Sequence, residues 1–131
     1  MCLHNATIVK ADFKVKKYWK TFYVRNGIIS SVVYNKHYKN GWNYPDPQVI
    51  YLEDKGIHCF NNQKDAKFYR DSWGINEEVV CSVYCLGSDL IATGYTEITN
   101  NGKLVPSTTF NKVFIRRKDY EKLLKGESVH D

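Results

Sequence analysis

Short runs of aromatic and β-branched residues, many of them alternating with polar residues, dominate the chain and are typical of β-strands. The clearest signal is a pair of such runs, at residues 17–25 and 28–34, which Asn26-Gly27 joins directly. Asn-Gly suits a type I′ turn because both central positions of that turn need a positive φ angle. The pattern therefore predicts a β-hairpin with its tip at Asn26-Gly27.

Further strands are expected along the rest of the chain. Residues 79–86 are nearly all apolar or β-branched, which indicates a central strand that is covered on both faces. The tract 35–48 contains Gly41, Pro45 and Pro47, so we expect an irregular loop there. The other expected strands are 5–10, 49–52, 56–60, 90–98 and 109–115.

Two short segments are predicted to be helical. In residues 64–73, apolar side chains recur at spacings of three and four, and Asn61 or Asn62 precedes them as a candidate N-cap. In residues 119–125, Asp119 is the expected cap. A mainly antiparallel β-sheet with two short α-helices, at about 64–73 and 119–125, belongs to the α+β class.

Size and composition favour one folded domain. The chain has 131 residues, of which 43% are hydrophobic, so we expect a single domain over 1–131 with 127–131 as a frayed tail. Its apolar runs are much shorter than the roughly 20 residues that cross a bilayer. The first residues lack the basic start and apolar run of a secretory signal. We therefore expect a cytoplasmic protein without membrane contact.

Positive charge is concentrated in the N-terminal third. The net charge is +5, yet the first forty residues alone hold eight lysines and arginines against one acid, Asp12. Aromatic residues are interleaved with these cations, and alternation along 17–25 places both kinds on one face of the strand. The candidate ligand-binding residues are Lys17, Trp19, Tyr23, Arg25, Lys39 and Trp42.

This combination favours an anionic nucleotide or a nucleic acid as the partner, because cations attract phosphate and flat rings stack on bases. Aromatic side chains are also typical anchors of protein interfaces, so another protein is an alternative partner. A third interpretation is that the lysines merely solubilise a hairpin whose rings reflect the preferences of strands.

No motif for metal or cofactor binding is present. The four cysteines Cys2, Cys59, Cys81 and Cys85 contain no C-x-x-C pair, so we expect reduced thiols, no metal site and no cofactor. His58 is expected to be a structural histidine within a strand. It cannot form a catalytic dyad with Cys59, because neighbouring strand residues point to opposite faces.

One segment carries a resemblance to known proteins. Lys55-Gly56-Ile57-His58-Cys59-Phe60 precedes a predicted helix that contains Asp65-Ala66, and the chain begins Met1-Cys2-Leu3. In these features it resembles a group of small, mostly uncharacterised bacteriophage and prophage proteins. The resemblance implies an origin in a mobile element rather than a particular activity. It also implies that the protein would act in the cytosol of a host cell.

The order of strand, helix and long central strand also resembles the core of ADP-ribosyltransferases. That resemblance implies a catalytic Glu, for which Glu97 is the candidate, and an upstream Arg or His, for which Arg25 or His58 would serve. The chain departs from the pattern because Phe60-Asn61-Asn62 stands where Ser-Thr-Ser is expected, and because no Glu-x-Glu precedes the last strand. We therefore assign no catalytic residue.

The sequence thus predicts a non-enzymatic, phage-type binding or inhibitor protein that acts against host defence. It would sequester an anionic nucleotide ligand or occupy a host partner that handles nucleic acid. The alternatives are an enzyme resembling ADP-ribosyltransferases and an inhibitor that binds only protein, a host defence protein, through an aromatic interface.

Overall fold

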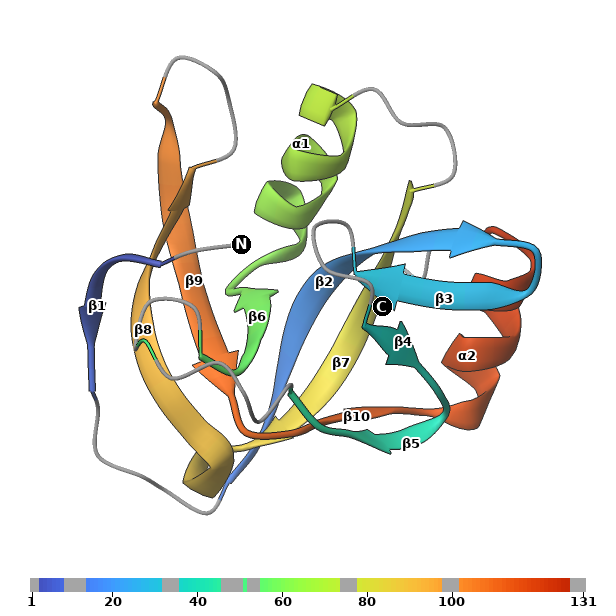
Figure 1. Ribbon diagram of the computed structural model, residues 1–131, viewed down its shortest axis with the longest axis horizontal. Helices are drawn as coiled ribbons and strands as arrows, with labels where there is room; N and C mark the ends of the chain where they lie inside the picture. Colours follow the sequence, from blue (N-terminus) through green and yellow to red (C-terminus); the bar gives the residue numbers. More distant parts are fainter. Residues whose placement is uncertain are drawn as a thin grey trace.

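A curved antiparallel β-sheet forms most of the protein in the computed structural model (Figure 1). The structure describes residues 3–8, 14–31, 36–45, 51, 55–73, 78–97 and 102–127, with the backbone alone at 71–73 and 78. Within these ranges the strands are β1 (His4–Thr7), β2 (Val15–Arg25), β3 (Ile28–Ser31), β4 (His37–Tyr38), β5 (Gly41–Asn43), β6 (Ile57–Phe60), β7 (Glu78–Leu86), β8 (Leu90–Glu97), β9 (Leu104–Phe110) and β10 (Val113–Ile115). A 3₁₀ turn, η1 (Gly87–Asp89), joins β7 to β8.

Strand β2 lies at the centre of the sheet, whose order is β1-β8-β9-β6-β2-β7-β10-β5. One edge of β2 pairs with β7 from Val15 to Tyr23. Its other edge pairs with β6 at Trp19 and with β3 from Phe22 onward, and β3 in turn pairs with β4. The central position of β7, expected from its apolar sequence, is confirmed.

The predicted hairpin is also confirmed. β2 and β3 pair from Phe22↔Ser31 to Arg25↔Ile28, and the turn between them contains Asn26 at φ 52° and Gly27 at φ 75°. Two consecutive positive φ angles are what the Asn-Gly pair tolerates at little cost. Residues 32–34 of the expected second arm lie outside the described residues.

The expectation of an irregular loop over 35–48 is wrong for its first half, which contains β4 and β5. The turn between these strands is closed by Asn43, whose side chain accepts from the Lys39 N–H at 2.9 Å and donates to the Lys39 carbonyl at 2.8 Å. The turn is thus held by a buried side-chain amide, and the alternation of polar and apolar residues gives no sign of such a bond. The expected strand at 49–52 lies outside the described residues except for Tyr51.

The last predicted strand, 109–115, is divided in the structure. β9 begins earlier, at Leu104, and includes Pro106, whereas β10 starts only after a break at Asn111 and Lys112. The bend redirects the chain from β8 and β6 to β7 and β5.

Both predicted helices are present, as α1 (Gln63–Trp73) and α2 (Arg117–Leu124). Asn62 caps α1, because its side-chain oxygen accepts from the Asp65 N–H at 2.9 Å. Asp119, the expected cap of α2, instead lies inside its first turn. The fold is therefore a mainly antiparallel β-sheet with two helices, richer in strand than a balanced α+β protein. Neither helix, within the described residues, is long and apolar enough to span a membrane.

The sheet carries a hydrophobic cluster on each face. The main core lies on the inner face, where Phe22, Val83 and Phe110 pack together and Leu123 of α2 joins them. On the opposite side, called the α1 face here, Ala66 and Tyr69 of α1 cover Phe60 and other residues of the sheet. Since strand residues alternate between faces, odd and even positions of each strand serve different surfaces.

Candidate functional site

A row of four directly opposed residues crosses four adjacent strands. Lys17 on β2 lies opposite Tyr84 on β7, Tyr84 lies opposite Phe114 on β10, and Phe114 lies opposite Trp42 on β5. At about 4.8 Å per strand spacing, this cross-strand row is about 14 Å long. All four side chains are half-buried.

The cross-strand row lies on the α1 face. The neighbours of its members along each strand, such as Tyr18, Val83 and Val113, pack into the main core on the inner face. Alternation directs the row itself to the opposite side. In Figure 1, α1 crosses the upper part of the sheet while β10 and β5 run along the bottom, so the α1 helix leaves this end of the face open.

Three cations lie over the rings of this region. The Nζ atom of Lys112 is 4.5 Å from the centre of the Trp42 ring, and the guanidinium carbon of Arg116 is 4.7 Å from that of Tyr84. Lys17 Nζ is 5.7 Å from the Trp19 ring. The Trp42 and Phe114 rings meet edge to face at 5.2 Å. Such pairs are attractive because the face of an aromatic ring is electronegative.

The three cations differ in how firmly acids hold them. Arg116 donates to both oxygens of the buried Asp119, at 2.7 and 3.2 Å, which fixes and neutralises the guanidinium. Lys112 is 4.0 Å from Asp89. Among the described residues, no carboxylate lies within salt-bridge distance of Lys17. Lys17 and Lys112 are therefore the cations able to pair with an incoming anion.

The structure brings together only part of the predicted site. Lys17, Trp19 and Trp42 lie at the cross-strand row, whereas Tyr23 and Arg25 continue along β2 beyond Thr21. The Thr21 hydroxyl donates to the Ala66 carbonyl of α1 at 2.9 Å, so the helix covers β2 between the two groups.

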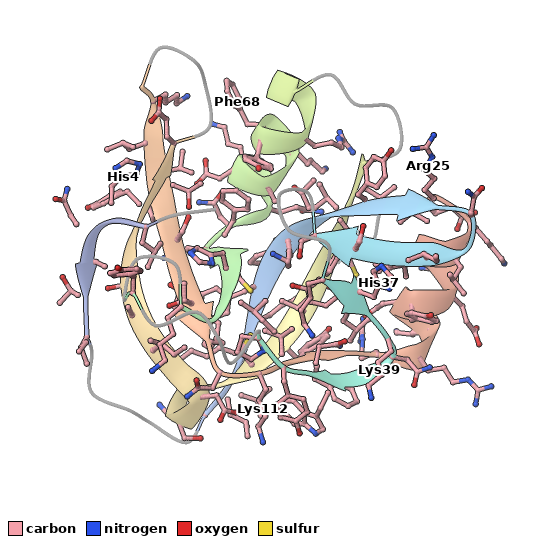
Figure 2. All side chains as sticks on the ribbon, viewed as in Figure 1. His4, Arg25, His37, Lys39, Phe68 and Lys112 are labelled. Carbon is pink, nitrogen blue, oxygen red and sulfur yellow. The ribbon has the colours of Figure 1, made fainter. Side chains whose placement is uncertain are left out.

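The remaining predicted residues lie apart from the row. Figure 2 shows Arg25 near the tip of the β2–β3 hairpin and Lys39 beside β5, well separated from each other. Arg25 donates to the Tyr23 hydroxyl at 3.4 Å. Lys39 is exposed, and its backbone is bound by Asn43.

Trp19 is less accessible than the sequence indicated. Its indole packs against the cluster of Phe60, Ala66 and Tyr69 under α1. Its Nε1 atom is buried without a hydrogen-bond partner among the described residues, as is the hydroxyl oxygen of Ser82, which lies directly opposite on β7. Trp19 thus packs against the α1 cluster and borders the row at the same time.

Sequence reasoning missed Tyr84, Phe114 and Lys112. The alternation of Tyr84 and Phe114 with core residues was a usable signal, because it marks them as facing away from the main core. They form a row with Trp42 only because β10 pairs with both β7 and β5, and no local sequence pattern reveals that pairing.

The residues cast in a transferase role are not brought together. His58 lies opposite Thr109 on β9, whereas Glu97 lies opposite Leu104. Counting along the paired strands places His58 on the α1 face and Glu97 on the inner face, so the sheet separates the two side chains. His58 is also buried, at 4% exposure, and Glu97 is exposed.

The cysteines lie in the main core. Cys59, Cys81 and Cys85 are free, buried thiols, and Cys2 is outside the described residues. A hydrogen bond with Cys59, together with burial, raises the pKa of the Cys85 thiol well above its usual range. Burial also raises the pKa of Tyr18 nearby. The Cys85 thiol is therefore a poor nucleophile near neutral pH.

The most distinctive surface in the described part of the chain is thus a half-buried row of rings that α1 leaves uncovered, with loosely held lysines at its edges. Its chemistry suits a ligand that combines flat rings with negative charge. Comparison of the chain with protein-family models, curated proteins and solved structures found no match in any of the three.

Proposed function

We propose that this chain is a non-enzymatic binding protein that holds single-stranded nucleic acid on the cross-strand row. The observation that carries the proposal is the alignment of Tyr84, Phe114 and Trp42 on adjacent strands, with Lys17 and Lys112 beside them. Proteins that bind single strands combine such stacking rings with cations that follow the backbone.

The shape of the surface favours a strand over a free nucleotide. The row extends about 14 Å across the sheet, so a ligand with several bases in series reaches all of its rings. A single nucleotide placed on this open surface would contact one ring and one lysine. Its affinity would then rest on a small fraction of the available contacts.

The two lysines have a clear role in this proposal. Lys112 lies over the Trp42 ring in the free protein, and an arriving base takes over that ring face while the ammonium group moves to a phosphate. The exchange gives up a cation–π contact worth about 0.5–1 kcal/mol and gains a stacking contact worth about 1–3 kcal/mol. Lys17, at the β2 end of the row, binds a phosphate directly. Arg116 stays bound to Asp119 and over the Tyr84 ring, so the base at this position stacks on the guanidinium plane that covers Tyr84.

A protein that binds its ligand without catalysing a reaction fits the phage origin that the resemblance suggests. A protein that retains a nucleotide-containing anion acts by sequestration, which would oppose a host defence that depends on that molecule. The alternative of a protein-only inhibitor uses the same rings as interface anchors. Because His58 and Glu97 lie on opposite faces, the geometry gives no support to a transferase.

Fluorescence anisotropy with a labelled oligothymidylate of about twelve nucleotides tests the proposal. We expect Trp42→Ala to weaken binding about five- to a hundredfold, which corresponds to one lost stacking contact. Lys17→Ala should lower the affinity and reduce its salt dependence between about 50 and 200 mM salt. Arg25→Ala is the matched control, because it removes the same charge from the distant hairpin tip.

Two results would contradict the proposal. Equal effects of Lys17→Ala and Arg25→Ala would indicate attraction to overall charge rather than to the row. Absence of binding at low salt would favour the protein-only inhibitor, for which a Trp42→Ala variant should lose its host partner in a co-purification.

A further inference from the structure

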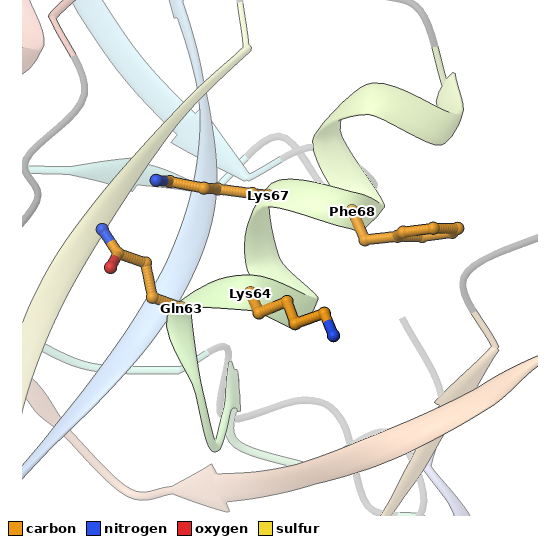
Figure 3. Close-up of a pocket in the computed structure, with 4 residues that line it drawn as sticks. All are labelled: Gln63, Lys64, Lys67 and Phe68. Atoms are coloured by element: carbon orange, nitrogen blue, oxygen red, sulfur yellow. The ribbon is translucent and has the colours of Figure 1, made fainter.

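A second basic and aromatic site lies on the solvent side of α1. Gln63, Lys64, Lys67 and Phe68 line a shallow hollow of about 350 Å³ there (Figure 3). Phe68 is 40% exposed, and the Nζ atom of Lys103 lies 4.4 Å from the centre of its ring. Lys103 belongs to the connection between β8 and β9, so two elements distant in sequence form this site.

The composition of the hollow selects for negative charge. Its lining holds two ammonium groups, one amide and one ring, and no carboxylate. Asp65, the acid on the same turn, receives a hydrogen bond from the Asn62 side chain at 2.7 Å while its own N–H is bound by Asn62. An amide that can both donate and accept is suited to the edge of a base, and the lysines to phosphate.

The hollow and the cross-strand row share one face of the sheet. The inward side of α1, with Ala66 and Tyr69, packs on that face, and Trp19 contacts the same cluster. Trp19 is two residues from Lys17, the β2 end of the row. A strand that leaves the row at β2 therefore meets α1 next.

We propose that the α1 hollow is a second contact site for the strand that occupies the cross-strand row. Lys64 and Lys67 bind its phosphates and Phe68 stacks on one of its bases, so that binding extends from β5 across the sheet to the helix. This inference rests on the proposed function, because the row must hold the same strand.

Oligothymidylates of two lengths, about four and about twelve nucleotides, separate the two sites. A short strand fills the row alone, whereas a long one reaches the hollow. We expect the double variant Lys64→Ala/Lys67→Ala to weaken the long strand about tenfold and to lower the magnitude of its log–log salt slope by about 1.4. The affinity for the short strand should change less than about twofold, since its phosphates stay on the row.

The matched control is Lys122→Ala/Lys125→Ala, which removes two exposed charges from the end of α2. We expect it to leave the binding of both lengths nearly unchanged. Phe68→Ala should weaken only the long strand, with a salt slope equal to that of the unaltered protein. Circular dichroism of each variant checks that it is folded.

The outcomes distinguish this inference from the proposed function. If both lengths bind equally well and the α1 variants change neither affinity, the proposal of a second site is wrong. The proposal that the row binds the strand is then unaffected. If Lys64→Ala/Lys67→Ala and the α2 control weaken the long strand equally, the effect is general charge and the second site is again wrong. If Trp42→Ala affects neither length, the row is wrong and the joint path fails with it.

Discussion

The two faces of the sheet differ in how completely their buried polar groups are bonded. On the inner face, the buried ammonium of Lys20 donates to the His58 carbonyl at 2.8 Å and lies 5.8 Å from the Tyr38 ring. On the α1 face, three buried polar atoms have no partner among the described residues. They belong to Trp19, Ser82 and Thr96. A fourth such atom, Asp89 Oδ2, lies in the η1 turn, where Lys112 Nζ is 4.0 Å away.

This difference indicates that the inner face mainly stabilises the fold, whereas the α1 face is suited to binding. A buried polar group without a partner costs about 1–3 kcal/mol, so the α1 face is not arranged for stability alone. It is also the face that carries the cross-strand row and the α1 hollow. The inner face has the larger cluster, and nearly all of its members are fully buried.

The largest expected effect compares one buried phenylalanine on each face. Phe22 and Phe60 are 0% and 1% exposed. Phe22→Ala should lower the free energy of unfolding by about 3–5 kcal/mol, because it opens a cavity between strands that cannot close. Phe60→Ala should cost about 1 kcal/mol less, since α1 can settle toward the sheet. Urea denaturation measures both, and the reverse order would refute the contrast between the faces.

Lys20 gives the next largest effect. Lys20→Ala should destabilise the protein by about 2–4 kcal/mol, because it leaves a cavity and removes the buried hydrogen bond to the His58 carbonyl. Lys20→Met keeps the volume and removes the buried charge, so its stability should stay within about 1 kcal/mol of the original or exceed it. If both variants lose the same amount, the charge itself is required for folding. The free energies come from the same urea titrations.

Alkaline pH should weaken the inner face through Cys85. Its pKa is raised in the folded protein, so above about pH 8.5 the unfolded chain loses a proton that the folded protein keeps. The free energy of unfolding should therefore fall with rising pH, by up to about 1.4 kcal/mol per pH unit, and Tyr18 should add to the fall above about pH 10. Cys85→Ala should flatten the slope between pH 8.5 and about 10. An unchanged slope in thermal melts would exclude this thiol as the cause.

Local features of the fold could be predicted from the sequence, and long-range ones could not. The Asn26-Gly27 turn, the capped helix α1 and the buried strand β7 each depend on short-range chemistry that the sequence displays. The division of the last strand at Asn111 and the strands within 35–48 depend on distant partners. These features arise from pairing between strands, which the residues next to them in sequence do not indicate.

The candidate site followed the same division. Alternation correctly placed Lys17 and Trp19 on one face of β2, but the docking of α1 at Thr21 separated Tyr23 and Arg25 from them. The pairing of β10 with β5 then brought Trp42 to Lys17 through two rings that the charge pattern did not mark, Tyr84 and Phe114.

The smallest expected effect tests the unbonded groups of the α1 face directly. Ser82 is fully buried and its hydroxyl has no partner among the described residues, whereas the Thr21 hydroxyl on the same face donates to Ala66. Ser82→Ala removes a polar group that gains nothing from folding, so the free energy of unfolding should stay the same or rise by up to about 1 kcal/mol. Thr21→Val, its matched control, should lower that free energy by about 1 kcal/mol because a real hydrogen bond is lost.

Urea denaturation at one temperature measures both variants, and equal m-values would show that the unfolded states are comparable. A loss of more than about 1 kcal/mol in Ser82→Ala would mean that the hydroxyl is bonded, for instance to an ordered water shared with the Trp19 indole. In that case only the Thr96 hydroxyl, of the three groups on the α1 face, would still lack a partner among the described residues. The bonding of buried polar groups would then hardly distinguish the two faces. The rings and lysines of the row would be the feature that sets the α1 face apart.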